Sequence, residues 1–173
     1  MQRTKGNISF PELVNAASWV ANALGVHPNI DEPHMVRGAI CRICLKDDRI
    51  QCDTIGHLRS DDPKSRELAK MVMGRAREKA EFLFCHHQPG SEIKASSQID
   101  PAREGAIIAH DCVLAVDGMP NHLVPVANET VAILAASQVG LLCDKKTAEL
   151  GTLTKNSSLD EIQEIVEGVP CSR

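Results

Sequence analysis

The stretch 105-GAIIAHDCVLAVDGMPNH-122 contains two short apolar runs with His110 between them. Apolar runs of this length, bounded by turn-forming residues, are typical of strands. They predict an antiparallel hairpin with strands near 105–109 and 112–117. In a continuous strand His110 and Cys112 would share one face and could meet a ligand, whereas a turn between the runs would leave both at the hairpin tip. The stretch is interpreted first as part of a sheet, and a ligand role for His110 stays open.

A second hairpin is predicted upstream of this stretch. The β-branched and thiol side chains of 36-VRGAICRICL-45 and 50-IQCDTIGHL-58 flank a short charged turn. Between the two hairpins, apolar residues recur at helical spacing over 63–84, directly after the N-cap candidates Asp61 and Asp62. Residues 63–84 therefore form the most clearly predicted helix of the chain.

One further helix is predicted on each side of this central pattern. The first spans about 10–24 and begins at Ser9-Phe-Pro-Glu12, which has the spacing of a capping box. The other begins at Pro125 and carries an apolar face. The segments 26–34 and 95–104, which are rich in Pro, Asp, Asn or Ser, are predicted to be loops.

The chain has the size of one domain, 1–173, because 173 residues can bury a core without disulfides or metals. Residues 1–8 are predicted to be a flexible N-terminus. Residues 143–173 are predicted as a C-terminal extension of mixed character with one short helix, which begins at the capping-box spacing Ser158-Leu-Asp-Glu161. Paired strands interrupted by helices indicate an α+β fold, in which helices cover one or both faces of an antiparallel sheet.

Composition excludes several classes of partner. The net charge of -4, together with 2% aromatic residues and no Tyr, argues against a nucleic-acid partner. No apolar run approaches the ~20 residues that span a membrane, and the start of the chain lacks the apolar core of a signal peptide. We therefore expect a cytoplasmic protein with no membrane partner, whose seven Cys residues are mostly buried free thiols.

Two clusters contain residue types that bind metals. Cys41 and Cys44 form a C-x-x-C pair, but the surrounding pattern predicts a strand, in which residues three apart face opposite sides. Cys85, His86 and His87 end the central helix and are the candidate ligands for zinc or iron, or for haem through an axial imidazole. Alternatively, these histidines simply complement the negative end of the helix dipole.

Motifs of known enzymes are missing from the sequence. It contains no Gly-rich phosphate loop, no H-E-x-x-H and no G-x-S-x-G. The carboxylate pairs Asp47-Asp48 and Asp61-Asp62 are explained by a turn and by a helix cap. His57 and His122 lie beside predicted turns and are further ligand candidates. No catalytic residue is predicted.

Two stretches of the chain resemble the GlcG/HbpS-like family of small α+β proteins. One is 112-CVLAVDGMPNH-122 running into 126-VANETVAILAA-136, which is similar to the family's strand, turn and Ala-rich helix. The other is 66-RELAKMVMGRAREKAEF-82, which is similar to the Lys- and Ala-rich helix after the family's first hairpin. The order of predicted elements over about 10–142 is also similar, although 102-AREG-105 stands where the family has Gly-Gly-x-Pro.

This resemblance implies a profilin-like or PAS-like sheet, haem as the ligand and a homodimer or higher homo-oligomer. The ligand pocket would lie between the sheet and a covering helix, with His86, His87 and His110 as ligand-binding residues. The leading hypothesis is a non-catalytic domain that binds a small molecule or acts as a sensor. The alternatives are a metal- or thiol-dependent enzyme that uses Cys85 and these histidines, and a dimeric interaction module without a ligand.

Overall fold

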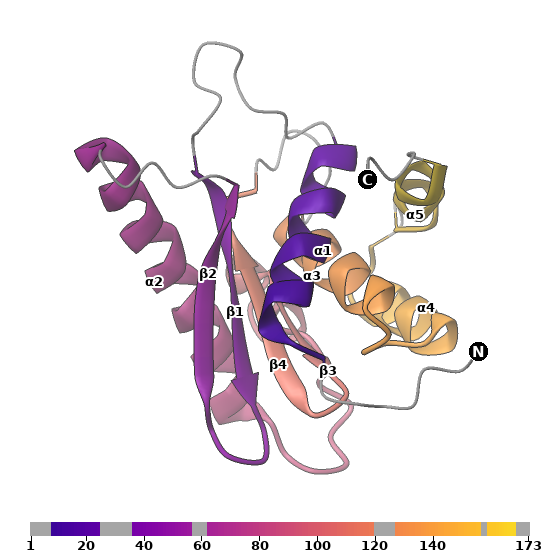
Figure 1. Cartoon of the computed structure of the whole chain (residues 1–173). Coiled ribbons are helices and arrows are strands. Elements are labelled where there is room, and N and C mark those ends of the chain that lie inside the picture. Colours follow the sequence, from indigo (N-terminus) through magenta and orange to yellow (C-terminus); the bar gives the residue numbers. More distant parts are fainter. Residues whose placement is uncertain (1–7, 25–35, 57–61, 120–126, 157–158, 169–173) are drawn as a thin grey trace.

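The computed structural model describes residues 8–24, 36–56, 62–119, 127–156 and 159–168 of the chain. Within these residues, four strands form one antiparallel sheet, with helices against both of its faces (Figure 1). This arrangement confirms the predicted α+β fold. The sheet, its connections and the covering helices together position the side chains of the two pockets described below.

The sheet joins the two predicted hairpins through their inner strands. β1 (Val36–Cys44) and β2 (Ile50–Gly56) form the first hairpin, and β3 (Ala106–Ala109) and β4 (Cys112–Asp117) form the second. β1 and β4 pair antiparallel, which gives the strand order β2-β1-β4-β3. The second hairpin agrees with its predicted strands to within one residue.

Two apolar layers separate the sheet from its helices. α2 (Pro63–His86) covers one face, where Cys41 of β1 belongs to the apolar cluster beneath the helix. α1 (Phe10–Ala23) and α3 (Ala127–Gln138) cover the other face, where Ile40 lies in the larger cluster (Figure 1). Because successive residues of a strand point to opposite faces, β1 contributes apolar side chains to both layers.

Local capping groups begin the two helices that the sequence predicts most clearly. The Ser9 hydroxyl accepts the Glu12 backbone N–H at 3.4 Å, and the Glu12 carboxylate accepts the Ser9 N–H at 2.9 Å, so the predicted capping box is present. At α2, an Asp62 carboxylate oxygen accepts the Lys64 N–H at 3.0 Å, and Pro63 occupies the first turn. Both helix starts therefore follow from neighbouring residues.

The C-terminal part of the chain departs from the predictions. α3 is buried on every side over 127–136, not on one face alone, because it lies between the sheet, α1 and α4 (Asp144–Leu153). The predicted C-terminal extension contains α4 as well as α5 (Leu159–Gly168), where one short helix was expected. The buried side chains of α4 are few, chiefly Thr147 and Leu150, which explains why its apolar periodicity is weak.

Some predicted features lie outside the described residues. They are most of the N-terminus 1–8, the loop 26–34, the candidate ligands His57 and His122, the expected start of α3 at Pro125 and the cap at Ser158.

His110 and Asp111 form the turn between β3 and β4. His110 adopts a φ of 54°, in the left-handed region, which a continuous strand does not use. The Leu45 N–H donates to the Asp111 carbonyl at 2.9 Å and ties this turn to the end of β1. The turn, and not the continuous strand, is therefore the correct interpretation of the residues between the two apolar runs.

Candidate functional site

The ligand residues predicted at the end of α2 lie at or near the surface. His86 is exposed, with its Nδ1 2.7 Å from the Phe82 carbonyl oxygen and its ring packed on the Phe82 ring at 4.4 Å between centroids. Cys85 is exposed, and His87 is half-buried, with an Nδ1 that has no hydrogen-bond partner in the described structure. Among the described residues, no three His, Cys, Asp or Glu side chains are grouped as metal ligands. A ligand or metal role for Cys85, His86 and His87 stays a prediction.

Cys41 and Cys44 face opposite sides of the sheet, as the strand pattern predicts. Cys41 is buried in the cluster beneath α2. Cys44 is half-buried on the other face, in register with Cys112 of β4. The two sulfur atoms of the C-x-x-C pair therefore cannot act together as a redox or metal site.

A cavity of about 440 Å³ lies where the β3–β4 turn meets the ends of β1 and β2 and the start of α1. Its volume falls in the range of about 300–1,000 Å³ that is usual for small-molecule sites. We call it the cationic pocket, because Arg42 and Arg49 line it and Asp111 is the one acidic side chain among its described lining residues. His110 also lines it. The other lining residues are Ile8, Ser9, Phe10, Pro11, Cys44, Gln51, Cys112, Gly140 and Leu141.

Arg42 brings a buried charge to this pocket from the middle of β1, with 8% of the residue exposed. Its guanidinium donates to the Ile8 carbonyl at 2.8 Å and, through two nitrogens, to the Gln51 side-chain oxygen. It also lies 5.4 Å from the centroid of the Phe10 ring. All these partners are neutral, and no carboxylate of the described residues forms an ion pair with Arg42. A buried charge is costly unless it is paired, so this cavity favours an anion.

Arg49 and His110 occupy the exposed part of the same lining. The Asp47 carboxylate accepts the Arg49 backbone N–H at 3.2 Å, and the Arg49 guanidinium lies 3.9 Å from the Cys44 sulfur. Neither the Arg49 nor the His110 side chain is needed by the apolar core. Both can therefore contact a ligand without disturbing the fold.

Cys112 is the buried thiol of the cationic pocket. It is 2% exposed, and its Sγ donates to the Ala109 carbonyl at 3.2 Å. Burial, with a further contribution from the Asp111 carboxylate, raises the pKa of this thiol to about 12. Because the thiolate is the reactive form, Cys112 is not suited to act as a nucleophile at neutral pH.

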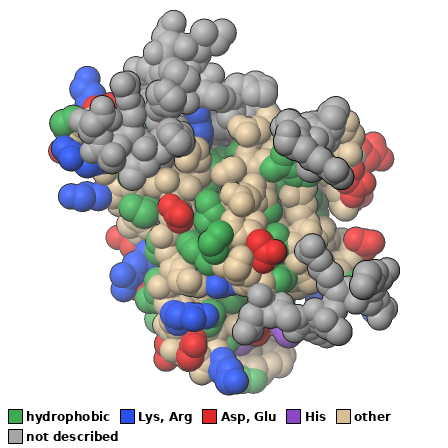
Figure 2. Space-filling model, viewed as in Figure 1, with side chains coloured by type: hydrophobic (Ala, Val, Ile, Leu, Met, Phe, Trp, Pro, Cys, Tyr) green, Lys and Arg blue, Asp and Glu red, His purple; other side chains and the backbone are tan. Residues whose placement is uncertain are grey.

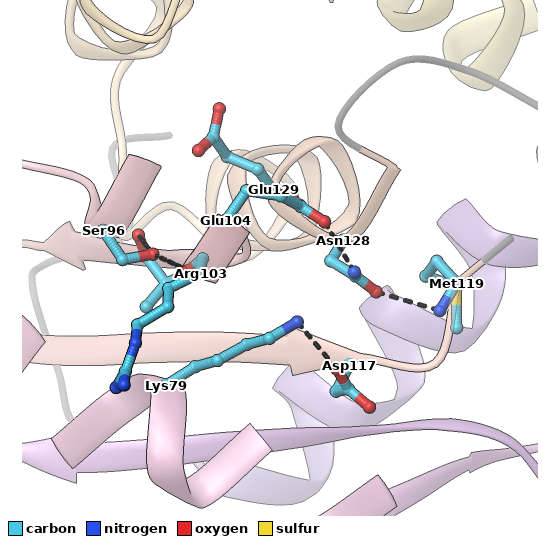
Figure 3. Close-up of polar contacts among 9 residues, drawn as sticks. Lys79, Ser96, Arg103, Glu104, Asp117, Met119, Asn128 and Glu129 are labelled. Atoms are coloured by element: carbon cyan, nitrogen blue, oxygen red, sulfur yellow. Dashed lines mark hydrogen bonds and ion pairs between the residues drawn. The ribbon is translucent and has the colours of Figure 1, made fainter. Parts of the chain in front are cut away.

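A larger cavity, about 610 Å³, lies between α2, the loop before β3, the end of β4 and the start of α3, and we call it the polar pocket. Several of its polar groups contact one another, as Figure 3 shows. Lys79 Nζ lies 2.7 Å from Asp117 Oδ1. Asn128 Nδ2 donates to Glu104 at 2.6 Å, and Asn128 Oδ1 accepts the Met119 N–H at 2.9 Å. These contacts connect four segments of the chain. The described lining has as many basic side chains as acidic ones, namely Arg75, Lys79 and Arg103 against Glu78, Glu104 and Asp117.

Glu129 extends this network into the core, where none of the residue is exposed. Its backbone N–H donates to Glu104 at 2.9 Å, and the Ser97 hydroxyl donates to its carboxylate at 2.6 Å. Burial raises the pKa of the Glu129 carboxyl, and the Ser97 hydrogen bond partly opposes this shift. The second carboxyl oxygen has no hydrogen-bond partner in the described structure. A protonated Glu129 therefore suits this position better than a charged one.

Sequence reasoning did not single out Arg42 or Glu129. The sequence marks each of them as a charged residue within an apolar stretch, because Arg42 interrupts an apolar strand pattern and Glu129 lies in an Ala-rich helix. Charged residues are rarely buried without a specific partner, so both positions were detectable as unusual. The partners were not detectable, because Ile8 lies 34 positions from Arg42 and Ser97 lies 32 positions from Glu129.

Comparisons of the chain with protein-family models, with curated proteins and with solved structures gave no match. Of the helices that the structure describes, none combines the length and apolar composition needed to cross a membrane. The choice between functions therefore depends on the chemistry of the two pockets.

Proposed function

We propose that the protein is a non-catalytic domain that binds a small anionic ligand in the cationic pocket. The observation that carries this proposal is Arg42, a guanidinium on a residue that is 8% exposed and hydrogen-bonded to neutral groups alone. A bound carboxylate would balance the charge of a guanidinium that is largely shielded from solvent, and charge-assisted hydrogen bonds to such a group are strong. Arg49 adds to the positive potential of the same cavity.

Haem is the ligand that the family resemblance implies, and several residues of the cationic pocket have the chemistry to contact it. Arg42 and Arg49 would pair with its two carboxylates, and Phe10 and Leu141 would pack against the apolar macrocycle. His110 would offer its imidazole to the iron. When bound, haem would supply an iron centre that binds diatomic gases or exchanges electrons, which is the chemistry of a sensory domain.

His86 and His87 form the competing location for an imidazole ligand. They end α2, and neither of them lines the cationic pocket. The Phe82 carbonyl already occupies Nδ1 of His86, which leaves its other nitrogen for a ligand. The haem proposal therefore makes His110 the first choice and the two histidines of α2 the alternative.

Titrations of the full chain with haemin and with protoporphyrin IX test the proposal, because the porphyrin has the carboxylates but no iron. Arg42→Met removes a buried charged donor, and such hydrogen bonds contribute about 1.5–3 kcal/mol, so both compounds should bind at least about tenfold more weakly. His110→Asn retains a residue that tolerates positive φ and removes the imidazole, so it should weaken haemin binding alone.

The variant with both His86→Ala and His87→Ala is the matched control and should leave both titrations unchanged. A ligating imidazole must be neutral, so haemin should bind the wild type more weakly as the pH falls. Loss of the Soret shift in the double variant, but not in His110→Asn, would move the site to the end of α2. Unchanged binding of both compounds by Arg42→Met would exclude the cationic pocket, and no saturable binding of either compound would exclude haem.

A homodimer or higher homo-oligomer is part of the proposal and is supported by the family resemblance. The exposed large hydrophobic side chains among the described residues are Met71 and Leu153, at 45% and 41% exposure. On the face seen in Figure 2, hydrophobic side chains lie in small groups between charged ones. Light scattering at micromolar concentration gives the mass of the particle, and a monomer mass would contradict the oligomer.

We also propose that the protein works in the cytoplasm. The six cysteines within the described residues are free thiols, which is the state that a reducing compartment maintains. Fractionation of cells that produce the tagged full chain tests this location, and recovery with secreted proteins would contradict it.

A further inference from the structure

The pairing of β1 with β2 brings two thiols into contact. Cys41 and Cys52 are register partners, and their sulfur atoms lie 2.8 Å apart. Residues directly opposite each other in an antiparallel pair have Cα atoms about 4.5–5.5 Å apart, which is a separation that a disulfide can span. Joining the two sulfur atoms therefore needs a small side-chain movement and no change in strand register.

A second pair of cysteines on the same strand shows that this contact is specific. Cys44 and Cys112 are also register partners, between β1 and β4. The Cys112 sulfur instead donates to the Ala109 carbonyl, and the Cys44 sulfur lies 3.9 Å from the Arg49 guanidinium. Opposite positions in the sheet are thus not sufficient for a sulfur–sulfur contact.

The two thiols in contact differ in their acidity. The hydrogen bond with Cys41 lowers the pKa of Cys52, and the guanidinium of Arg77 on α2 lowers it further against the effect of burial. The same hydrogen bond and burial raise the pKa of Cys41. Cys52, which is half-buried, is therefore the thiol that loses its proton more readily and acts as the nucleophile, and the buried Cys41 is the thiol that resolves its oxidised form.

We propose that Cys41 and Cys52 are a redox-sensitive dithiol, which hydroperoxides convert into a cross-strand disulfide. With hydrogen peroxide, the Cys52 thiolate attacks one oxygen, the O–O bond breaks, and the released hydroxide takes up a proton to become water. The Cys41 sulfur then attacks the resulting sulfenic acid and displaces hydroxide, which leaves as a second water with the Cys41 proton. The two thiols lose two electrons and two protons, and the peroxide is reduced to two waters.

The disulfide would join an edge strand to a central strand. β2 lies at the edge of the sheet, and edge strands open more readily than central ones. A covalent link at Cys41 and Cys52 would restrict this opening on the side of the sheet that packs against α2. Amide hydrogens of β2 should therefore exchange more slowly in the oxidised protein than in the reduced protein.

Tryptic peptides identify the bond without ambiguity, because Cys41 lies in 38–42, Cys44 in 43–46 and Cys52 in 50–59. The reduced full chain is treated with one equivalent of hydrogen peroxide, alkylated, digested and analysed by mass spectrometry. We expect peptide 38–42 linked to peptide 50–59, loss of two hydrogen atoms from the intact mass, and reversal of the link by dithiothreitol.

Three substitutions test the assignment of the bond, and two exposed cysteines of the same chain serve as oxidation controls. Cys52→Ser and Cys41→Ala should each abolish the link, whereas Cys44→Ser should preserve it. The exposed Cys85 and Cys143 report whether oxidant was present. Oxidation of these two thiols while the predicted peptides stay unlinked would overturn the proposal.

A link from peptide 43–46 to peptide 50–59 would overturn it equally. The peptide map of the wild type gives these answers even where a substitution prevents folding.

Discussion

The polar pocket and the cationic pocket differ in how their charges are balanced. In the polar pocket, Lys79 pairs with Asp117 at 2.7 Å, and Glu104 accepts hydrogen bonds from neighbouring groups. In the cationic pocket, Arg42 is hydrogen-bonded to neutral groups alone. Charges that pair within the protein stabilise the fold, whereas a buried charge without an ion-pair partner can still pair with the opposite charge of a ligand. The smaller cavity is therefore the better candidate for binding.

The largest effect on stability is expected from breaking the ion pair of the polar pocket. Lys79→Met keeps the aliphatic stem but leaves the Asp117 carboxylate buried, with its side chain 9% exposed, and without its cation. Removing one partner of a buried pair costs about 3–5 kcal/mol, so urea unfolding should show a loss near the lower end of this range. Adding Asp117→Asn to the variant should restore much of the stability, because the uncompensated charge is then absent.

Arg77→Met on the same helix is the control for this comparison. Its partner Glu81 is one turn away, and both side chains are largely solvated, at 55% and 44% exposure. Exposed pairs at this spacing contribute about 0.3–0.5 kcal/mol. Equal losses for Lys79→Met and Arg77→Met would contradict the structural role of the polar pocket.

A smaller effect on stability is expected in the cationic pocket. Arg42→Met removes hydrogen bonds to Ile8 and Gln51, each with a net contribution of about 0.5–1.5 kcal/mol, but it also removes an unpaired buried charge. Because the two effects oppose each other, we expect a net loss of about 1 kcal/mol in urea unfolding. A loss as large as that of Lys79→Met would mean that Arg42 has a compensating partner, and the contrast between the pockets would fail.

Glu129→Gln should change how the stability of the protein depends on pH. The folded protein holds the Glu129 proton more tightly than the unfolded chain, since burial raises the pKa of this carboxyl. Wild-type stability should therefore fall as pH rises from the ordinary Glu value of about 4.3 through the raised pKa. Glu129→Gln should lack this loss, so its advantage over the wild type in thermal unfolding should grow across the same window.

Ser97→Ala provides the opposite change at the same carboxyl. The Ser97 hydroxyl donates to Glu129 at 2.6 Å and favours the charged form. Its removal should extend the loss of stability to higher pH. Parallel pH profiles for the wild type and Glu129→Gln would show that Glu129 does not titrate in this way.

The smallest effect on stability is expected from Arg49→Ala. Arg49 is exposed and lies outside both apolar clusters, so the free energy of unfolding should change by no more than about 0.5 kcal/mol. An exposed charge contributes about 0.2–1 kcal/mol to an ion pair, so the affinity for haemin should fall by up to about fivefold at low salt. High salt should remove this difference, and an undiminished difference would mean that Arg49 acts other than through its charge.

Local sequence determined where the main elements begin and which residues face inward. The Ser9 and Asp62 caps depend on neighbours within three positions, and the alternating pattern of β1 predicted that Cys41 and Cys44 would diverge. The same kind of reasoning predicted the β3–β4 hairpin but did not decide between a turn and a continuous strand at His110. Apolar periodicity carries no information about the φ of 54° that this residue adopts. α4 escaped prediction, because its few buried side chains give a weak pattern.

Only the tertiary structure decided which side chains meet. Strand register places Cys52 against Cys41, and the docking of α1 places the Ile8 carbonyl on Arg42 from 34 positions away. A periodic pattern specifies the face on which a residue lies, but it carries no information about which distant residue will oppose it. His110 was therefore predictable as a candidate from sequence, whereas its place beside an unpaired Arg42 depended on packing between distant segments.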